Sequence, residues 1–227
     1  MKFLLPIIAL TAFSACSDHQ MGKDKIAGNN SRIPALVLAK AKQGHAYSQY
    51  QVATYYSNGE GVEKDADLAA EWYLKAAKQG FPEAQYNLGY LYLNGEGVDQ
   101  DKSKAFQYWR DAAKIGMPEA QFNLSVMYKA GEVVQPDTVE AVYWAREAAE
   151  RGHVDAAYNL GTWFGRGDGI PDDQAIAFEY YLKAAKGGKD NARAIVGLRY
   201  LDGDGVAEDR VRGFAWLLLV ESEGVRP

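Results

Sequence analysis

Residues 81–116 read FPEAQYNLGYLYLNGEGVDQDKSKAFQYWRDAAKIG, and this stretch decides the fold. Its first half predicts a helix that begins at Pro82, because proline suits the first turn of a helix and the glutamate after it complements the helix dipole. Ala84, Leu88 and Tyr92 then recur every fourth residue and form one apolar stripe. The asparagine–glycine pair that follows ends the helix, because glycine readily takes the left-handed conformation.

The second half of this stretch predicts another helix. It follows the turn GEGV at residues 95–98, and Asp101 is expected to cap it by accepting hydrogen bonds from exposed backbone N–H groups. Ala105, Tyr108 and Ala112 form its apolar stripe. Two helices this short cannot bury all their apolar faces alone, so each pair needs a neighbouring pair to cover it.

The same pattern recurs every 36 residues without insertion or deletion, which predicts an all-α solenoid of stacked helix-turn-helix units. The five windows are 45–80, 81–116, 117–152, 153–188 and 189–224. The capping column is Asp65, Asp101, Asp137, Asp173 and Asp209. A column of small residues, Ala53, Gly89, Ser125, Gly161 and Gly197, predicts that another helix backbone comes close there. The third turn is expected to differ in shape, because Val133 replaces its second glycine.

These motifs, A-x-x-x-L-G-x-x-Y, G-x-G-V, the capping aspartate and A-A-x-x-G, resemble those of the Sel1-like repeat family, relatives of the tetratricopeptide repeat. The resemblance covers residues 33–224. It implies a right-handed α-solenoid superhelix whose first helices line the concave face. It also implies a non-catalytic protein–protein interaction module that acts as an adaptor or scaffold.

The two ends of the chain carry different signals. Residues 1–15, a basic start and a short apolar run, resemble a bacterial lipoprotein signal peptide, which implies lipidation at Cys16, the chain's one cysteine. Residues 16–32 are polar and predict a flexible tether, in which a serine after the cysteine implies an outer-membrane lipoprotein facing the periplasm. Residues 33–44 predict an N-terminal capping helix, and residues 225–227 are a tail.

Candidate partner-binding residues belong to the first helices and to the last helix. Acidic and aromatic side chains flank the expected concave face, which suits a protein surface with basic and apolar groups. The aromatic ones have an alternative role, packing between neighbouring first helices. Apolar residues replace a mixed run near the C-terminus, which predicts cover by a partner, a second copy or a membrane, or else inward packing. The candidates are Glu83, Tyr86, Tyr90, Leu93, Glu119, Phe122, Tyr158 and Leu219.

Other classes of function find less support in the sequence. A formal net charge of −5 lacks the basic footprint of a nucleic-acid binder. His45 and His153 fall in the same column three repeats apart, and His19 lies in the tether, so we expect no metal, no cofactor and no catalytic residue. The resemblance allows a narrower alternative, an immunity protein that neutralises a phospholipase effector of type VI secretion. A cell-wall or β-lactam-directed enzyme is the remaining alternative.

The lipoprotein signal leads to a direct test. Cys16→Ala is expected to release the protein from the membrane into the soluble periplasm, because the acyl chains that hold it are attached to this side chain. Cell fractionation measures the change, with Ser14→Ala as the matched control. Membrane residence that Cys16→Ala leaves unchanged would refute the lipid anchor.

Overall fold

The computed structural model describes residues 32–224, and in this range the chain forms eleven helices and no strand. The predicted signal peptide, Cys16, most of the tether and the tail lie outside the described residues. The helices are α2 (Ala35–Lys42), α3 (Ala46–Asn58), α4 (Ala66–Ala77), α5 (Pro82–Asn94), α6 (Lys102–Ile115), α7 (Pro118–Ala130), α8 (Thr138–Glu150), α9 (Val154–Arg166), α10 (Gln174–Lys186), α11 (Asp190–Asp202) and α12 (Arg210–Gly224).

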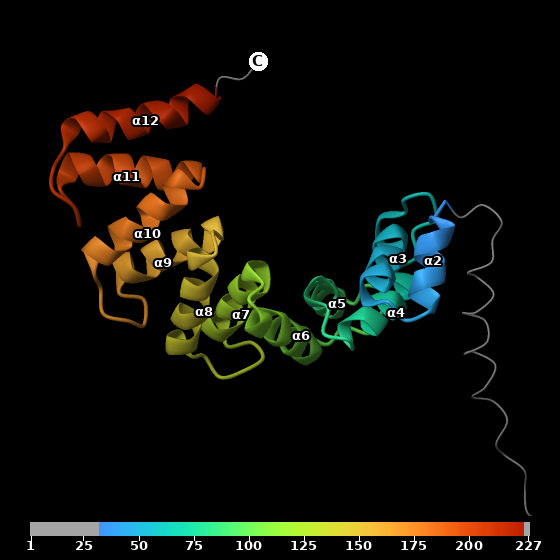
Figure 1. Ribbon diagram of the computed structural model, residues 1–227. Helices are drawn as coiled ribbons and strands as arrows, with labels where there is room; N and C mark the ends of the chain where they lie inside the picture. The colour runs from blue at the N-terminus through green and yellow to red at the C-terminus, as the bar shows by residue number, and fades with distance from the viewer. Residues whose placement is uncertain (1–31, 225–227) are drawn as a thin grey trace, which may run out of the picture.

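Each helix packs against the helix before it and the helix after it, so the fold is an α-solenoid. Figure 1 shows the helices following an open arch, with α2 and α3 at one end and α12 at the other. The first helices α5 and α7 lie nearer the hollow of the arch than the second helix α6 between them. The hollow is therefore lined by equivalent faces of successive repeats.

The local signals in the sequence act as predicted. In every repeat the side chain of the capping aspartate accepts a hydrogen bond from the backbone N–H three residues later, at 2.9–3.0 Å. The turn before it is closed as well, since the backbone N–H of Asp101 donates to the carbonyl of Tyr92 at 2.8 Å. Gly95 ends α5 in the left-handed conformation, with φ of 73°.

The third turn differs as predicted at Val133. The glycines at the equivalent position, such as Gly97 and Gly169, have φ of 68° and 80°, whereas the described residues include no non-glycine residue with positive φ. Val133 thus follows another backbone path, because a β-branched side chain is strained in the left-handed region. The turn still closes, since the N–H of Asp137 donates to the carbonyl of Tyr128 at 3.0 Å.

The column of small residues works differently from the prediction in two repeats. A Cβ on Gly89 would lie 2.3 Å from Nε1 of Trp109, and a Cβ on Gly161 would lie 2.8 Å from the ring of Tyr181. Aromatic side chains of the second helix, rather than a helix backbone, occupy the space that glycine leaves. At Gly197 a backbone does come close, with the carbonyl of Gly213 3.0 Å from a built Cβ, beside the side chain of Leu217 at 2.8 Å.

The core runs along the solenoid between the helices. Its centre is a column of fully buried residues on the first helices: Val52, Leu88, Leu124, Leu160 and Val196.

At the N-terminal end α2 packs against α3 and covers the first repeat. Arg32, placed in the predicted tether, already belongs to this end, because its backbone N–H donates to the carbonyl of Gly61 at 2.8 Å. Within residues 32–224, the structure has no helix with the length and apolarity needed to cross a membrane.

The contact between Gly89 and Trp109 predicts a reversal of sign in a double-mutant cycle. Gly89→Ala is expected to destabilise the protein by roughly 1–3 kcal/mol, because the added methyl overpacks against the indole. In a Trp109→Ala background the same change is expected to stabilise by about 1 kcal/mol, since alanine favours helices over glycine. Thermal unfolding followed by circular dichroism measures both. Equal destabilisation in the two backgrounds would show that the indole is not the cause.

Candidate interaction surface

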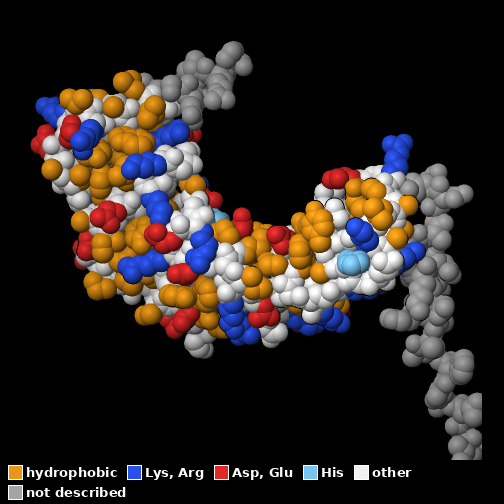
Figure 2. Space-filling view, in the orientation of Figure 1, with side chains coloured by type: hydrophobic (Ala, Val, Ile, Leu, Met, Phe, Trp, Pro, Cys, Tyr) orange, Lys and Arg blue, Asp and Glu red, His pale blue; other side chains and the backbone are white. Residues whose placement is uncertain are grey.

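The candidate surface is built from exposed side chains at equivalent positions of the first helices. Figure 2 shows acidic and apolar side chains along the floor of the hollow. One exposed column stands near the start of these helices: Tyr47, Glu83, Glu119, Asp155 and Asn191. A second column, seven residues further along, exposes apolar side chains in three repeats: Tyr90, Val126 and Leu198. The second and third repeats thus combine acidic and apolar groups.

The aromatic column beside these residues is half-buried. Its members are Tyr50, Tyr86, Phe122 and Tyr158. Tyr50 lies 5.1 Å from the ring of Phe81, and the Phe122 ring stacks on His153 at 4.4 Å. Tyr158 lies under the Nζ of Lys189 at 5.6 Å. In each case the partner precedes the next first helix, so part of every ring serves the packing between repeats, as the alternative role predicts.

Tyr86 and Tyr90 form one cluster with Trp109. Their rings meet edge to face at 5.0 Å, and the Tyr86 hydroxyl donates to the Tyr90 hydroxyl at 3.3 Å. The Tyr90 ring also lies edge to face on Trp109 at 5.1 Å, while the indole N–H of Trp109 donates to the carbonyl of Tyr86 at 3.0 Å. Tyr90, 38% exposed, is therefore held in place from two sides.

Acidic charge lies next to this cluster. Burial raises the pKa of Tyr86 above its ordinary value, and the hydrogen bond to Tyr90 and the nearby charge of Glu119 raise it further. Tyr86 therefore stays a neutral hydroxyl that donates. Glu83 and Glu119 are exposed on successive repeats, whereas Asp155 in the next repeat pairs with Lys189 at 2.6 Å. The acidic part of the surface is thus centred on the second and third repeats.

Two predicted residues remain, Leu93 and Leu219. Leu93 is partly buried and packs against the core cluster of the second and third repeats, so only part of it is accessible. Leu219 is 48% exposed on the last helix, far along the arch from Tyr90. The structure therefore brings together Tyr86, Tyr90 and Glu119, and separates Leu219 from them.

Trp109 is the residue of this surface that the sequence analysis missed. It is 3% exposed and supports Tyr90 from below. The sequence contains a signal for it. Across the repeats, the residue at the position of Trp109 is large where the residue at the position of Gly89 is glycine. Glycine faces tryptophan or tyrosine in the second and fourth repeats, while Ser125 stands in the repeat that has Ala145.

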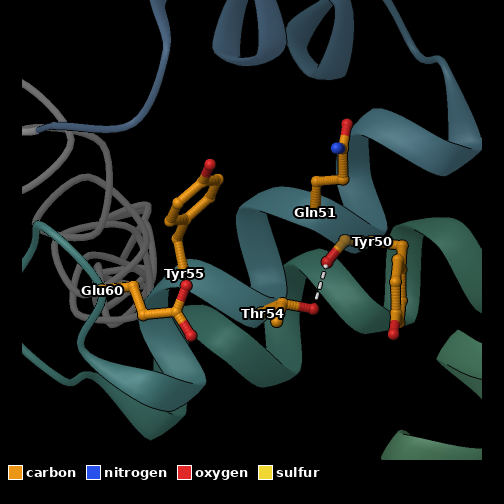
Figure 3. Close-up of a pocket in the computed structure, with 5 residues that line it drawn as sticks. All are labelled: Tyr50, Gln51, Thr54, Tyr55 and Glu60. Atoms are coloured by element: carbon orange, nitrogen blue, oxygen red, sulfur yellow. Dashed lines mark hydrogen bonds between the residues drawn. The ribbon is translucent and has the colours of Figure 1, made fainter.

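An open pocket in the first repeat offers no constellation of reactive groups. It has a volume of about 180 Å³ and is lined by Tyr50, Gln51, Thr54, Tyr55 and Glu60. Figure 3 shows that the Thr54 hydroxyl is turned back toward its own helix, where it donates to the carbonyl of Tyr50 at 3.1 Å. Among residues 32–224, no three His, Cys, Asp or Glu side chains are grouped so that they could hold a metal ion.

The chain belongs to the Sel1 repeat family, whose model matches residues 46–81, 82–117, 118–153, 154–189 and 191–219. No curated protein matches it. A solved structure of c5321, a protective antigen of uropathogenic Escherichia coli with an SLR fold, is 36% identical with a TM-score of 0.79. The match covers 83% of this chain but only 40% of that protein.

Two further solved structures share the fold. A Sel1 repeat protein from Oxalobacter formigenes is 32% identical over 80% of this chain and 72% of that chain, with a TM-score of 0.71. The immunity protein PA5088 from Pseudomonas aeruginosa matches 98% of this chain and 90% of its own length, with a TM-score of 0.50. At 19% identity the latter shows the fold alone.

His153 gives this surface a pH-dependent contact. Its Nδ1 accepts a hydrogen bond from the N–H of Ala156 at 3.2 Å, which requires that this nitrogen be unprotonated. Burial lowers the pKa of His153 below its ordinary value of 6.5, although the charges of Asp155 and Glu119 oppose this. The unfolded chain therefore takes up the proton first, so the stabilising effect is complete above about pH 6.5 and is lost as the pH falls.

We expect the free energy of unfolding to decrease from about pH 7 to about pH 5, and His153→Asn to make this decrease smaller, because asparagine caps the helix without titrating. Urea unfolding at a series of pH values measures the effect. His45→Asn is the matched control, since His45 holds the same position and its side chain makes no capping hydrogen bond. An identical pH profile in wild type and His153→Asn would contradict the assignment.

Proposed function

We propose that this protein is a non-catalytic interaction module, anchored by lipid at the periplasmic face of the outer membrane, that binds a protein partner on the concave surface of its second and third repeats. The observation that carries the proposal is the placement of Tyr90. Its ring is 38% exposed on the first helix α5, yet Tyr86 and Trp109 fix its orientation. Exposed tyrosine held in a rigid setting is a frequent anchor of protein interfaces.

The chemistry of the surface indicates the chemistry of the partner. Glu83 is exposed on the same helix one turn before Tyr86, and the charge of Glu119 acts on Tyr86 from the next repeat. A partner segment with lysine or arginine next to an apolar side chain would satisfy both features, because a cation also interacts favourably with the face of a tyrosine ring. The helices that carry these residues are already packed, so binding costs little ordering entropy.

The anchor rests on the sequence of the first seventeen residues. A short apolar run that ends in the chain's one cysteine is typical of a lipidated leader, and Ser17 after it favours the outer membrane. Such an anchor would leave the repeats free to meet a partner in the periplasm. The absence of catalysis is likewise part of the proposal, and it is supported by the family, whose repeats typically serve as interaction modules.

Two alternatives are distinguished by experiment. Immunity remains a hypothesis: PA5088 shares the fold, and a tethered inhibitor would meet a lipid-attacking effector at the membrane. A lipase gene next to this one, and inhibition of that lipase by the purified protein, would favour it. Hydrolysis of a reporter β-lactam or of cell-wall fragments by the purified protein would instead favour an enzyme and overturn the proposal.

Substitutions at the surface of the hollow test the binding site. We expect Tyr90→Ser combined with Glu119→Lys to remove one prominent partner from complexes captured by in-cell cross-linking and identified by mass spectrometry. A loss of at least about tenfold is expected, since an anchor residue and a complementary charge are removed together. Helicity should stay unchanged, because both side chains are exposed.

The matched control is Tyr143→Ser combined with Glu147→Lys on the second helix α8, where Tyr143 is also exposed. This control should retain the partner. An identical set of captured proteins for wild type and the Tyr90 variant would contradict the proposed surface. Loss of the partner in the control alone would move the binding site to the second helices.

A further inference from the structure

Within residues 32–224, no helix covers the outer side of the last helix, whereas every other second helix has such cover. α12 packs against α11, where Leu217 fills the space beside Gly197 and Leu201 lies against Gly213. In each earlier repeat the opposite side of the second helix is covered by the first helix of the next repeat. Figure 1 shows α12 at the end of the arch, with no described helix beyond it.

Phe214 on α12 is exposed, unlike the residues at its position in the other repeats. Its counterparts in the other repeats are all buried, with exposed fractions of 3–9%: Ala70, Phe106, Val142 and Phe178. Tyrosine rings of the next first helix cover two of them, since Phe106 meets Tyr128 at 5.4 Å and Phe178 meets Tyr200 at 5.1 Å. Phe214 itself is 54% exposed.

The apolar face of α12 is also wider than a following repeat would cover. Val211 is 82% exposed and Leu218 is 63% exposed, and together with Phe214 they follow the spacing of one helix face. Ala215 lies between them. At its position the first, second and fourth repeats carry Glu71, Gln107 and Glu179, which stay exposed although a following repeat is present. In the third repeat Val139 and Tyr143, at the positions of Val211 and Ala215, are exposed as well, so Phe214 and Leu218 are the centre of the apolar face offered to a further helix.

The distribution of charge along α12 indicates which helix could cover its apolar face. In the sequence both arginines of the helix, Arg210 and Arg212, precede residue 213, and both glutamates, Glu221 and Glu223, follow residue 220. Arg212 pairs with the capping Asp209 of its own helix, with Nε 3.3 Å from Oδ2, so Arg210 is the cation that an antiparallel pair would set near the glutamates at the end of the other helix. The same balance disfavours a lipid surface, because helices that lie on anionic membranes carry an excess of lysine and arginine.

We propose that α12 pairs antiparallel with α12 of a second copy of this chain, around a two-fold axis near the middle of the helix. Rows of side chains four residues apart, such as Val211 with Ala215 and Phe214 with Leu218, form the ridges by which helices interlock. A two-fold contact uses the same face on both copies and closes at two, so it removes the apolar face without forming a filament. The pairing goes beyond the proposed function and does not depend on a partner in the hollow.

Cysteine cross-linking of the full-length protein in its own membrane tests the pairing. Leu218 stands close to the proposed axis, so Leu218→Cys is expected to link to the same residue of a second copy through a short bis-maleimide. Residue 211 would lie roughly 18 Å along the axis from its own counterpart, six residues on either side of the middle. Val211→Cys is therefore expected not to link, and wild type, with Cys16 alone, is the background control.

A link between two copies of residue 218, identified by mass spectrometry, can only be intermolecular. Absence of this link would overturn the proposal, as would a link of Leu218→Cys to a different protein. Equal linking of Val211→Cys would indicate a parallel or random contact and would overturn the antiparallel geometry.

A second substitution tests the apolar contact itself. Phe214→Glu added to Leu218→Cys is expected to reduce the linked fraction about tenfold or more, because it places a charge inside the interface. Val139→Glu is the matched control, since Val139 is 76% exposed on α8, away from the proposed contact, and this variant should leave the linked fraction unchanged. A linked fraction that Phe214→Glu does not change would overturn the proposal. Both variants should keep the circular dichroism of the wild type, since the changed side chains are exposed.

Discussion

The structure depends on one constraint: a pair of short helices cannot bury its own apolar surface. Phe106 and Phe178 are buried on second helices, where the next repeat places Tyr128 and Tyr200 against them. Each repeat is thus completed by the one that follows. The arch, the continuous core and the exposed face of α12 are all consequences of this constraint, since the described chain supplies no following helix for the last repeat.

The same constraint sets which residues of the hollow are free to bind. The column of Tyr50, Tyr86, Phe122 and Tyr158 gives part of each ring to the contact between repeats. Regular positions are therefore used for stacking, and the irregular ones remain for recognition. Tyr90 combines both roles, because its neighbours fix the ring while part of it stays accessible. A solenoid can in this way vary its binding surface while the packing positions keep the fold.

Much of the fold was readable from local signals. The aspartates cap their helices and Gly95 ends α5 as expected, because capping and left-handed turns depend on a few adjacent residues. The role of the small column was predicted wrongly in two repeats. Gly89 and Gly161 make room for a side chain that lies twenty residues further along, and no local pattern shows which group will fill the space.

The sequence by itself determined the period, the helices, their caps and the family, since these follow from residues close together in the chain or from equivalent positions of successive repeats. Only the tertiary structure decided which side chains remain accessible. It showed that Tyr86 donates to Tyr90 above Trp109, that Leu93 is partly buried, and that Phe214 is exposed although its counterparts are not. The physical reason is that accessibility depends on what the neighbouring repeat covers, which is a property of the stack and not of any one repeat.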